Sequence, residues 1–253
     1  MRRTIARRRA AIEDALRTHL PEAGAFDRSP EELLELGRPR TRGQVFLAMA
    51  DGLGDERPLE ELVPIAASLE LVSLQVRLHR SAAEYGRRTG HKPTDDVLLG
   101  DLLESKAFAL TARFDAEPAL VERCLETLAE ATRAVQEGEA SLASEPQSSV
   151  LETDAVRRIG SLTGCAVELA ALLADVEPRR ELARHGNTLG YCARSRRPGN
   201  GVSTDRRHCP TDRSRWLEPI VECCPPDSKA AVRTQLSAVL EASIDREPAD
   251  PIA

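Results

Sequence analysis

Apolar residues recur every three or four positions through most of this 253-residue chain. In the longest apolar tract, residues 58–80, one side of a helix would carry Leu62, Ile65, Ala66, Leu69, Val72 and Val76. The period-two alternation that marks a half-buried strand does not extend over any length. Aromatic residues make up only 3% of the chain, so its core must consist mainly of Leu, Ala, Val and Ile. This composition favours helices, and we predict an all-α fold.

Start and stop signals divide this pattern into separate helices. Ser29 has the features of an N-cap, with Pro30 at the first helical position and acidic residues in the first turn. The predicted helices cover residues 5–20, 30–36, 44–53, 58–80, 94–114, 118–135, 154–175 and 230–244. The polar stretch 141–154 predicts a loop. We expect residues 1–253 to form a single domain, with an irregular, divergent segment at 192–228 that is rich in Arg, Pro and Ser.

The charge and hydropathy of the chain argue against a nucleic-acid-binding protein and against a membrane-spanning protein. A formal net charge of −6 argues against nucleic acid as the main partner. No stretch approaches the roughly 18 apolar residues of a membrane span, and the basic N-terminus lacks the apolar centre of a signal peptide. Residues 5–20 indicate an ordinary amphipathic first helix, with membrane contact through its arginines as the alternative. We therefore expect a cytoplasmic protein without a transmembrane segment.

Seven short motifs occur in order between residues 30 and 197. They are GRPRTRG (37–43), SLELVSLQVRLHR (68–80), RRTGHKPT (87–94), VLLGDLLESKAF (97–108), GEASLA (138–143), RIGSLTG (158–164) and NTLGYCARSRR (187–197). Their order resembles that of the motifs in the trans-isoprenyl diphosphate synthase, or polyprenyl synthetase, family. The strongest single match is 97–108 to the family's I-L-A-G-D-Y-L-L-A-x-A-F. The resemblance implies a helical isoprenoid-synthase-type bundle around a central cavity, shortened C-terminally relative to active members.

In that family, two D-D-x-x-D motifs face each other from helices across the cavity. They hold Mg²⁺ on an allylic diphosphate, and the metal ions stabilise the departing diphosphate. Isopentenyl diphosphate lies in a basic pocket and attacks the resulting carbocation with its double bond. The resemblance therefore implies which positions of this chain should carry acidic residues that hold Mg²⁺ and which should carry basic residues that bind diphosphate.

Both acidic motifs are degenerate in this sequence. The first falls on residues 80–84, where Arg80 and Ser81 replace the leading acids and only Glu84 remains. The second falls on residues 197–201, with Arg197 and Pro198 at its start and no acid. One carboxylate beside an arginine is a poor site for hard cations. We therefore predict no catalytic residues, no metal site and no cofactor.

The basic half of the pattern is better preserved. Arg40 and Arg42 match the two arginines of the family's G-G-K-R-L-R-P, of which the second contacts isopentenyl diphosphate. Arg87 and Arg88 match the arginine pair that meets the two diphosphates. The resemblance implies diphosphate binding by these four residues, and for the pair at 87–88 a solvated loop is the alternative.

These observations favour a catalytically degenerate, non-catalytic or regulatory subunit of an isoprenyl diphosphate synthase, able to bind an isoprenyl diphosphate. The family implies a homodimer, or a heterodimer with an active synthase. One alternative is an active Mg²⁺-dependent prenyltransferase that uses Glu84 with Asp95, Asp96 or Asp101, although the acids at 95–96 also suit a helix start. A second alternative is a stand-alone protein that binds a prenyl or phosphate compound.

Four of the six cysteines lie in residues 192–228. Cys192, Cys209, Cys223 and Cys224, with His208, lack the C-x-x-C spacing typical of zinc sites. We expect reduced, scattered thiols, as is usual in the cytosol. The composition of this segment is explained equally by loss of constraint, by a shifted reading frame or by a separate function.

Overall fold

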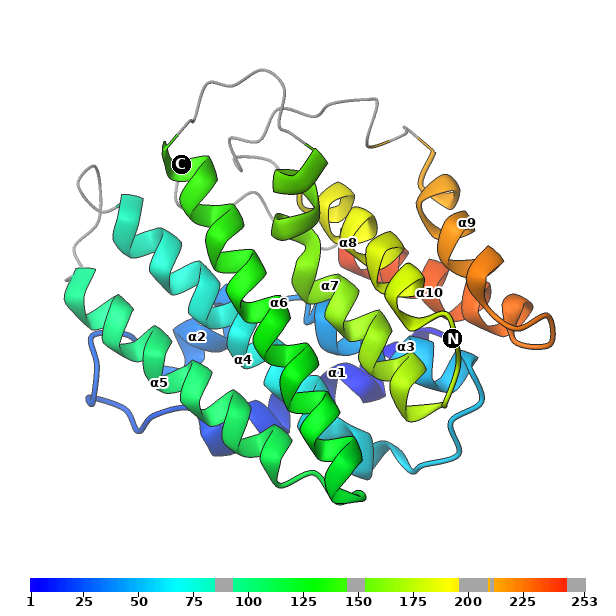
Figure 1. Ribbon diagram of the computed structural model, residues 1–253. Helices are drawn as coiled ribbons and strands as arrows, with labels where there is room; N and C mark the ends of the chain where they lie inside the picture. Colours follow the sequence, from blue (N-terminus) through cyan, green and yellow to red (C-terminus); the bar gives the residue numbers. More distant parts are fainter. Residues whose placement is uncertain (85–92, 145–152, 196–208, 210–211, 245–253) are drawn as a thin grey trace.

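The computed structural model describes residues 1–84, 93–144, 153–195, 209 and 212–244. Within these residues the chain forms ten helices and no strand (Figure 1), so the predicted all-α fold is confirmed. The helices are α1 (Arg2–His19), α2 (Pro30–Leu36), α3 (Thr41–Gly52), α4 (Leu59–Glu84), α5 (Pro93–Ala112), α6 (Pro118–Ser144), α7 (Thr153–Leu173), α8 (Arg179–Ser195), α9 (Ser214–Cys223) and α10 (Lys229–Ile244).

Helix α2 begins where the sequence predicts. The Ser29 hydroxyl accepts a hydrogen bond from the backbone N–H of Glu32, and the Glu32 carboxylate accepts one from the backbone N–H of Ser29 at 2.6 Å. This reciprocal pair satisfies two backbone donors that the first turn leaves without partners. Pro30 follows at the first helical position, where its missing N–H removes no helical hydrogen bond.

Helix α3 lies at the centre of the bundle and packs against α4, α7 and α10. Almost its whole length is buried, including Phe46 and Met49. Helix α1 covers α3 and α4 with the apolar face predicted from the sequence, because Ile5, Ile12 and Leu16 are buried. The N-terminal helix is therefore a packed part of the bundle.

Helices α7 and α8 approach each other unusually closely. A Cβ atom at Gly160 would lie 1.8 Å from the backbone oxygen of Asn187, and one at Gly164 would lie 1.8 Å from the Oδ1 atom of the same residue. Only glycine permits this contact between helices. The packing fixes the direction of α8, whose C-terminal end points to the same end of the bundle as those of α4 and α6 (Figure 1).

The structure corrects three sequence predictions at the level of local structure. Residues 192–228 were predicted to be irregular, but α9 lies within them and buries Trp216, Leu217, Ile220 and Val221. Pro219 and the surrounding arginines obscured this short apolar face. Cys192 and Cys209 were expected to be reduced, and the structure joins them as a disulfide. The loop predicted at 141–154 overlaps two helices, because α6 continues to Ser144 and α7 begins at Thr153.

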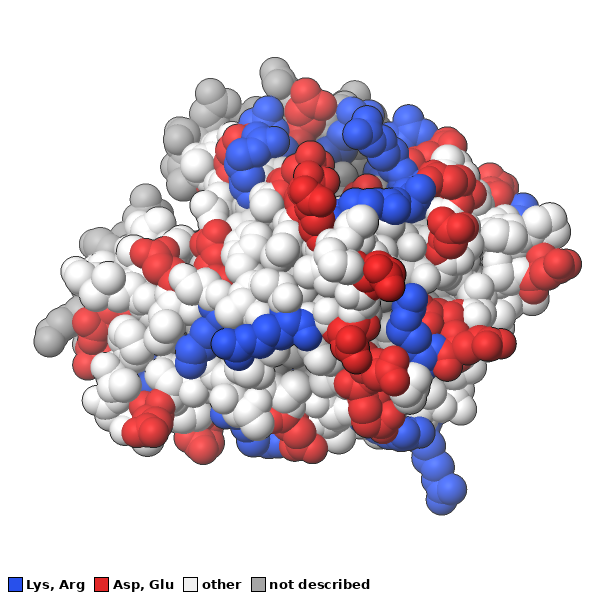
Figure 2. Space-filling view, turned by 60° about the horizontal axis from the view of Figure 1, so that its bottom comes forward, with Lys and Arg blue, Asp and Glu red and all other residues white. Residues whose placement is uncertain are grey.

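None of the described helices combines the length and apolar character needed to cross a bilayer. Basic and acidic side chains are interspersed among broad uncharged areas on the face shown in Figure 2. This face therefore differs from the single-sign surfaces that attract nucleic acids.

Candidate functional site

Helix α4, which carries the first degenerate acidic motif, and helix α8, which precedes the second in sequence, end at the same end of the bundle (Figure 1). Arg80 and Ser81 lie in the last turns of α4. Glu84 is the last residue of α4, and its side chain is outside the described part. Arg87 and Arg88 of the predicted diphosphate-binding set, and Arg197 and Pro198 of the second motif, also lie outside the described residues. The geometry of the site therefore rests on α4 and its neighbours.

A guanidinium from outside the motifs contacts the first motif. Arg28, in the segment before α2, donates a hydrogen bond from Nη2 to the Ser81 hydroxyl at 3.2 Å. The same side chain forms two hydrogen bonds with Asp96 of α5, at 2.6 and 2.9 Å. The Arg28 side chain is only 10% exposed, and that of Asp96 is 2% exposed. The hydrogen bond to Asp96 raises the pKa of Arg28, against the effect of burial. A permanent cation therefore lies beside the second position of the motif.

Other acids near these helix ends also have internal basic partners. Asp101, on α5, lies 3.3 Å from Nε2 of His79 on α4. The imidazole of His79 packs against Gly100, where a Cβ atom would be 2.5 Å from Nε2. Glu139 of α6 pairs with Arg194 of α8, with one of the two hydrogen bonds at 3.0 Å. Of the three aspartates proposed as substitute metal ligands, Asp96 is thus engaged within the fold, whereas Asp101 lies beside His79 with its side chain 58% exposed.

A Mg²⁺ cluster requires several oxygen ligands, of which carboxylates provide most of the charge. At the end of α4, the described side chains supply an arginine, a serine hydroxyl and the guanidinium of Arg28. Only one group of three or more potential metal ligands converges among the described side chains, and it lies elsewhere, at Glu181, His185 and Cys223. The described residues at the end of α4 therefore do not fit a magnesium cluster.

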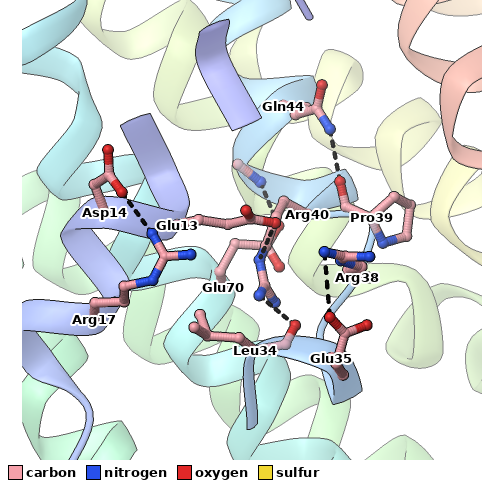
Figure 3. A network of polar contacts seen from close by, with 11 residues as sticks. Glu13, Asp14, Arg17, Leu34, Glu35, Arg38, Pro39, Arg40, Gln44 and Glu70 are labelled. Carbon is pink, nitrogen blue, oxygen red and sulfur yellow. Dashed lines mark hydrogen bonds and ion pairs between the residues drawn. The ribbon is translucent and has the colours of Figure 1, made fainter. Parts of the chain in front are cut away.

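Arg40 is the N-cap residue of α3 and adopts the left-handed conformation, with φ of 66°. Its side chain is fully buried and lies among Glu13, Leu34 and Glu70 (Figure 3). It donates a hydrogen bond to the backbone oxygen of Leu34, and its Nε lies 3.8 Å from the Glu13 carboxylate. Figure 3 also shows Glu70 pointing toward this group, and Glu70 accepts a hydrogen bond from the backbone N–H of Gly43 at 2.8 Å.

This environment determines what Arg40 can contact. Burial lowers the pKa of its guanidinium, and the carboxylates of Glu70 and Glu13 act in the opposite direction. Gly37 leaves the space that the guanidinium fills, since a Cβ atom there would lie 2.1 Å from Nη1. Arg40 thus exposes no surface to a diphosphate, and its predicted ligand contact gains no support from the geometry. Arg42 is half-buried, and its diphosphate contact stays a prediction.

Two surface hollows are formed by described residues away from the motifs. One, of about 520 Å³, lies where α5 turns into α6 and is lined by Phe114, Val121 and Leu125. The other, of about 410 Å³, includes Glu130, Glu168 and Arg180 from α6, α7 and α8. Neither lies between the ends of α4 and α8. The central cavity stays a prediction, because the segments that follow both helices are outside the described residues.

Helical topology and motif order define the class of protein: an all-α fold of the isoprenyl synthase type. No family profile matches the sequence. The chain is 26% identical over 196 residues to the geranylgeranyl diphosphate synthase of Methanosarcina mazei, a match that covers 72% of this chain and 59% of that protein. The chain thus spans less than two thirds of the length of this curated relative.

Solved structures show the same fold. The geranyltransferase of Helicobacter pylori, complexed with magnesium and isoprenyl diphosphate, superposes with a TM-score of 0.70 at 15% identity, over 94% of this chain and 96% of that one. The geranyl diphosphate synthase small subunit of Antirrhinum majus superposes with a TM-score of 0.68 at 15% identity, over 92% and 97%. The chain therefore shares the fold of these proteins, and its sequence is similar to that of an isoprenyl diphosphate synthase.

Proposed function

We propose that this chain is a non-catalytic or regulatory subunit of an isoprenyl diphosphate synthase. The observation that carries the proposal is the buried contact of Arg28 with Ser81 and Asp96. In an active synthase this end of the helix pair holds metal ions. Here a guanidinium, which keeps its charge at any physiological pH, lies at one motif position, and arginine replaces the acid at another.

The electrostatic reason is direct. A divalent cation at the end of α4 would lie near the positive charge of Arg28 without carboxylates at positions 80 and 81 to offset it. The Asp96 carboxylate, the nearest substitute, is already neutralised by two hydrogen bonds from Arg28. Recruiting Asp96 to a metal would leave a largely buried arginine without its partner, which is costly.

Ligand binding without turnover is part of the proposal. Arg42 of the family's basic motif is retained and half-buried, and Arg87 and Arg88 are retained in sequence. Arginine binds phosphate oxygens through paired N–H groups and needs no metal to do so. An isoprenyl diphosphate is therefore the ligand class that we assign to the chain.

We propose that helix α5 forms the surface that contacts a partner. Among the described residues, the large apolar side chains that are exposed are those of Met1, Val97 (39%) and Leu98 (55%), and two of these are neighbours on α5. The apolar hollow at the far end of α5 includes Ala112 and Phe114. We propose that the side chains of Val97 and Leu98 belong to a contact with a partner, since contiguous exposed apolar surface marks interaction sites. The fold is shared with a protein named as a synthase small subunit, and an active isoprenyl diphosphate synthase is the partner that we propose.

Turnover assays test the proposal. The full chain is incubated with Mg²⁺, isopentenyl diphosphate and an allylic diphosphate, first alone and then co-expressed with an active isoprenyl diphosphate synthase. We expect no product from the chain alone and co-purification with the synthase. Product above background from the chain alone would instead support the active prenyltransferase. Absence of both product and co-purification would leave the stand-alone binding protein.

A surface variant separates pairing from folding. Leu98→Glu places a charge on the exposed apolar part of α5 and should abolish co-purification. Ala231→Glu makes the same change at an exposed position of α10 and should leave it intact. Equal behaviour of the two variants would show that α5 does not form the partner surface.

A further inference from the structure

Helices α8 and α9 bring three different metal-ligand types together. Glu181 and His185 are four residues apart on α8, so they project from the same side of the helix. Cys223 is the last residue of α9, which packs against α8. One ligand atom from each of the three side chains lies within 4.8 Å of the others. His185 Nε2 is 3.9 Å from Glu181 Oε1.

We infer that Glu181, His185 and Cys223 form a binding site for a divalent transition metal of the zinc type. Zn²⁺ binds carboxylate oxygen, imidazole nitrogen and thiolate sulfur at about 2.0–2.3 Å, in tetrahedral geometry. The three atoms therefore need only small side-chain rotations to surround one ion. Mg²⁺ and Ca²⁺ prefer oxygen ligands and do not match a set that includes sulfur and nitrogen.

The two adjacent cysteines point in different directions, which explains why only one belongs to the site. Cys224 is buried, and its thiol donates to the backbone oxygen of Ile220 at 3.2 Å. Burial raises the pKa of Cys224 to about 11. Cys223 is half-buried and lies beside the acid and the imidazole of α8. The site thus differs from a zinc set made of Cys192, Cys209, Cys223 and Cys224.

The charges around the site are compatible with a metal. The Glu181 carboxylate supplies negative charge beside His185 Nε2. The Arg184 guanidinium donates to Glu181 at 3.1 Å, but both side chains are about half exposed, and such pairs are weak. A bound ion must displace the thiol proton of Cys223, because a metal binds the thiolate form of cysteine.

The position of this group makes it independent of the proposed function. His185 precedes Ser195, the last residue of α8, by about 15 Å of helix at 1.5 Å per residue. The magnesium region of the family would lie at that far end. A metal at the proposed site links α9 to α8, with three protein ligands and a fourth position for water.

Cobalt titration of the full chain tests the inference. The protein is treated with a chelator, dialysed and titrated with Co²⁺ as the probe. We expect one equivalent to bind, with d–d bands of four-coordinate intensity and a thiolate-to-cobalt charge-transfer band. Excess Zn²⁺ should remove both signals and raise the unfolding temperature. A chain that takes up no stoichiometric Co²⁺ would overturn the inference.

Variants locate the ion. Cys223→Ser should abolish the charge-transfer band, and His185→Gln should weaken Co²⁺ binding at least tenfold, while helical circular dichroism reports that both variants are folded. The matched controls are Glu222→Gln and a Cys192→Ser/Cys209→Ser double variant, and both should retain the band. Loss of the band in the double variant, or its persistence in Cys223→Ser, would place the metal elsewhere and refute the site.

Discussion

Two arginine–carboxylate sites lie near helix α4. The arginine of one belongs to a sequence motif, and the arginine of the other does not. Arg40, at the start of α3, was predicted to bind a diphosphate, yet it is fully buried against Leu34, Glu13 and Glu70. Arg28 belongs to no motif, yet it contacts the residue at a metal-ligand position. A residue type that matches a motif can thus be buried in the core, and a residue outside every motif can contact a motif position.

The two sites also differ in how their charges are compensated. Arg40 faces two carboxylates at longer range, with the Glu13 oxygen at 3.8 Å, and donates to a backbone oxygen. Arg28 and Asp96 form a close two-point pair with both groups largely buried. Removal of either arginine leaves a buried carboxylate without its cation. Both sites are therefore expected to stabilise the folded state.

The largest effect is expected at Arg40. Arg40→Met should lower the free energy of unfolding by about 3–5 kcal/mol, because Glu70 is left in the core without a cation. Urea unfolding followed by circular dichroism measures this change. Arg38→Met is the matched control, since Arg38 is exposed and pairs with Glu35 on the surface at 3.2 Å. The control should cost at most about 1 kcal/mol, and equal losses would show that Arg40 is not structural.

A smaller effect is expected at the end of α4. Asp96→Asn removes the charge that Arg28 pairs with, and should cost about 2–3 kcal/mol because a charged hydrogen-bonded pair is lost. The neighbouring Asp95→Asn provides the control, since Asp95 is only half-buried. If both variants unfold at the same urea concentration, the Arg28–Asp96 pair does not hold this end of the bundle.

The smallest effect, with the opposite sign, is expected at Glu168. This half-buried carboxylate faces Glu130, and burial followed by that like charge raises its pKa. The ionised form is therefore disfavoured in the folded state, and stability falls as pH rises from the ordinary glutamate pKa through the raised value. Glu168→Gln should stabilise the protein at neutral pH, and the gain should vanish below about pH 4. A gain that persists in acid would point to packing instead of charge.

Local features of the fold were readable from the sequence. The Ser29–Glu32 capping pair and the three-four spacing of α4 depend on residues within one or two turns of each other. The Arg28–Asp96 contact joins residues 68 positions apart, and no periodicity or motif marks it. The burial of Arg40 was equally hidden, because the same motif letters describe an arginine turned toward a ligand or toward the core.

The segment at 192–228 likewise shows that contacts between distant residues cannot be read from the sequence. Its composition masked the apolar face of α9. Its cysteines separate into a disulfide, a buried thiol and the half-buried Cys223. The partner residues Glu181 and His185 belong to a different helix. Adjacency in sequence suggested one cysteine cluster, whereas the side-chain directions in the fold divide it.

The most direct test of the central claim is a calorimetric titration of the full chain with an allylic diphosphate analogue, with and without Mg²⁺. We predict that the end of α4 recruits no Mg²⁺, so the affinity for the diphosphate is the same in both titrations. A gain of tenfold or more with Mg²⁺, about 1.4 kcal/mol, would show that the protein assembles a metal cluster and would contradict the assignment of a silent subunit.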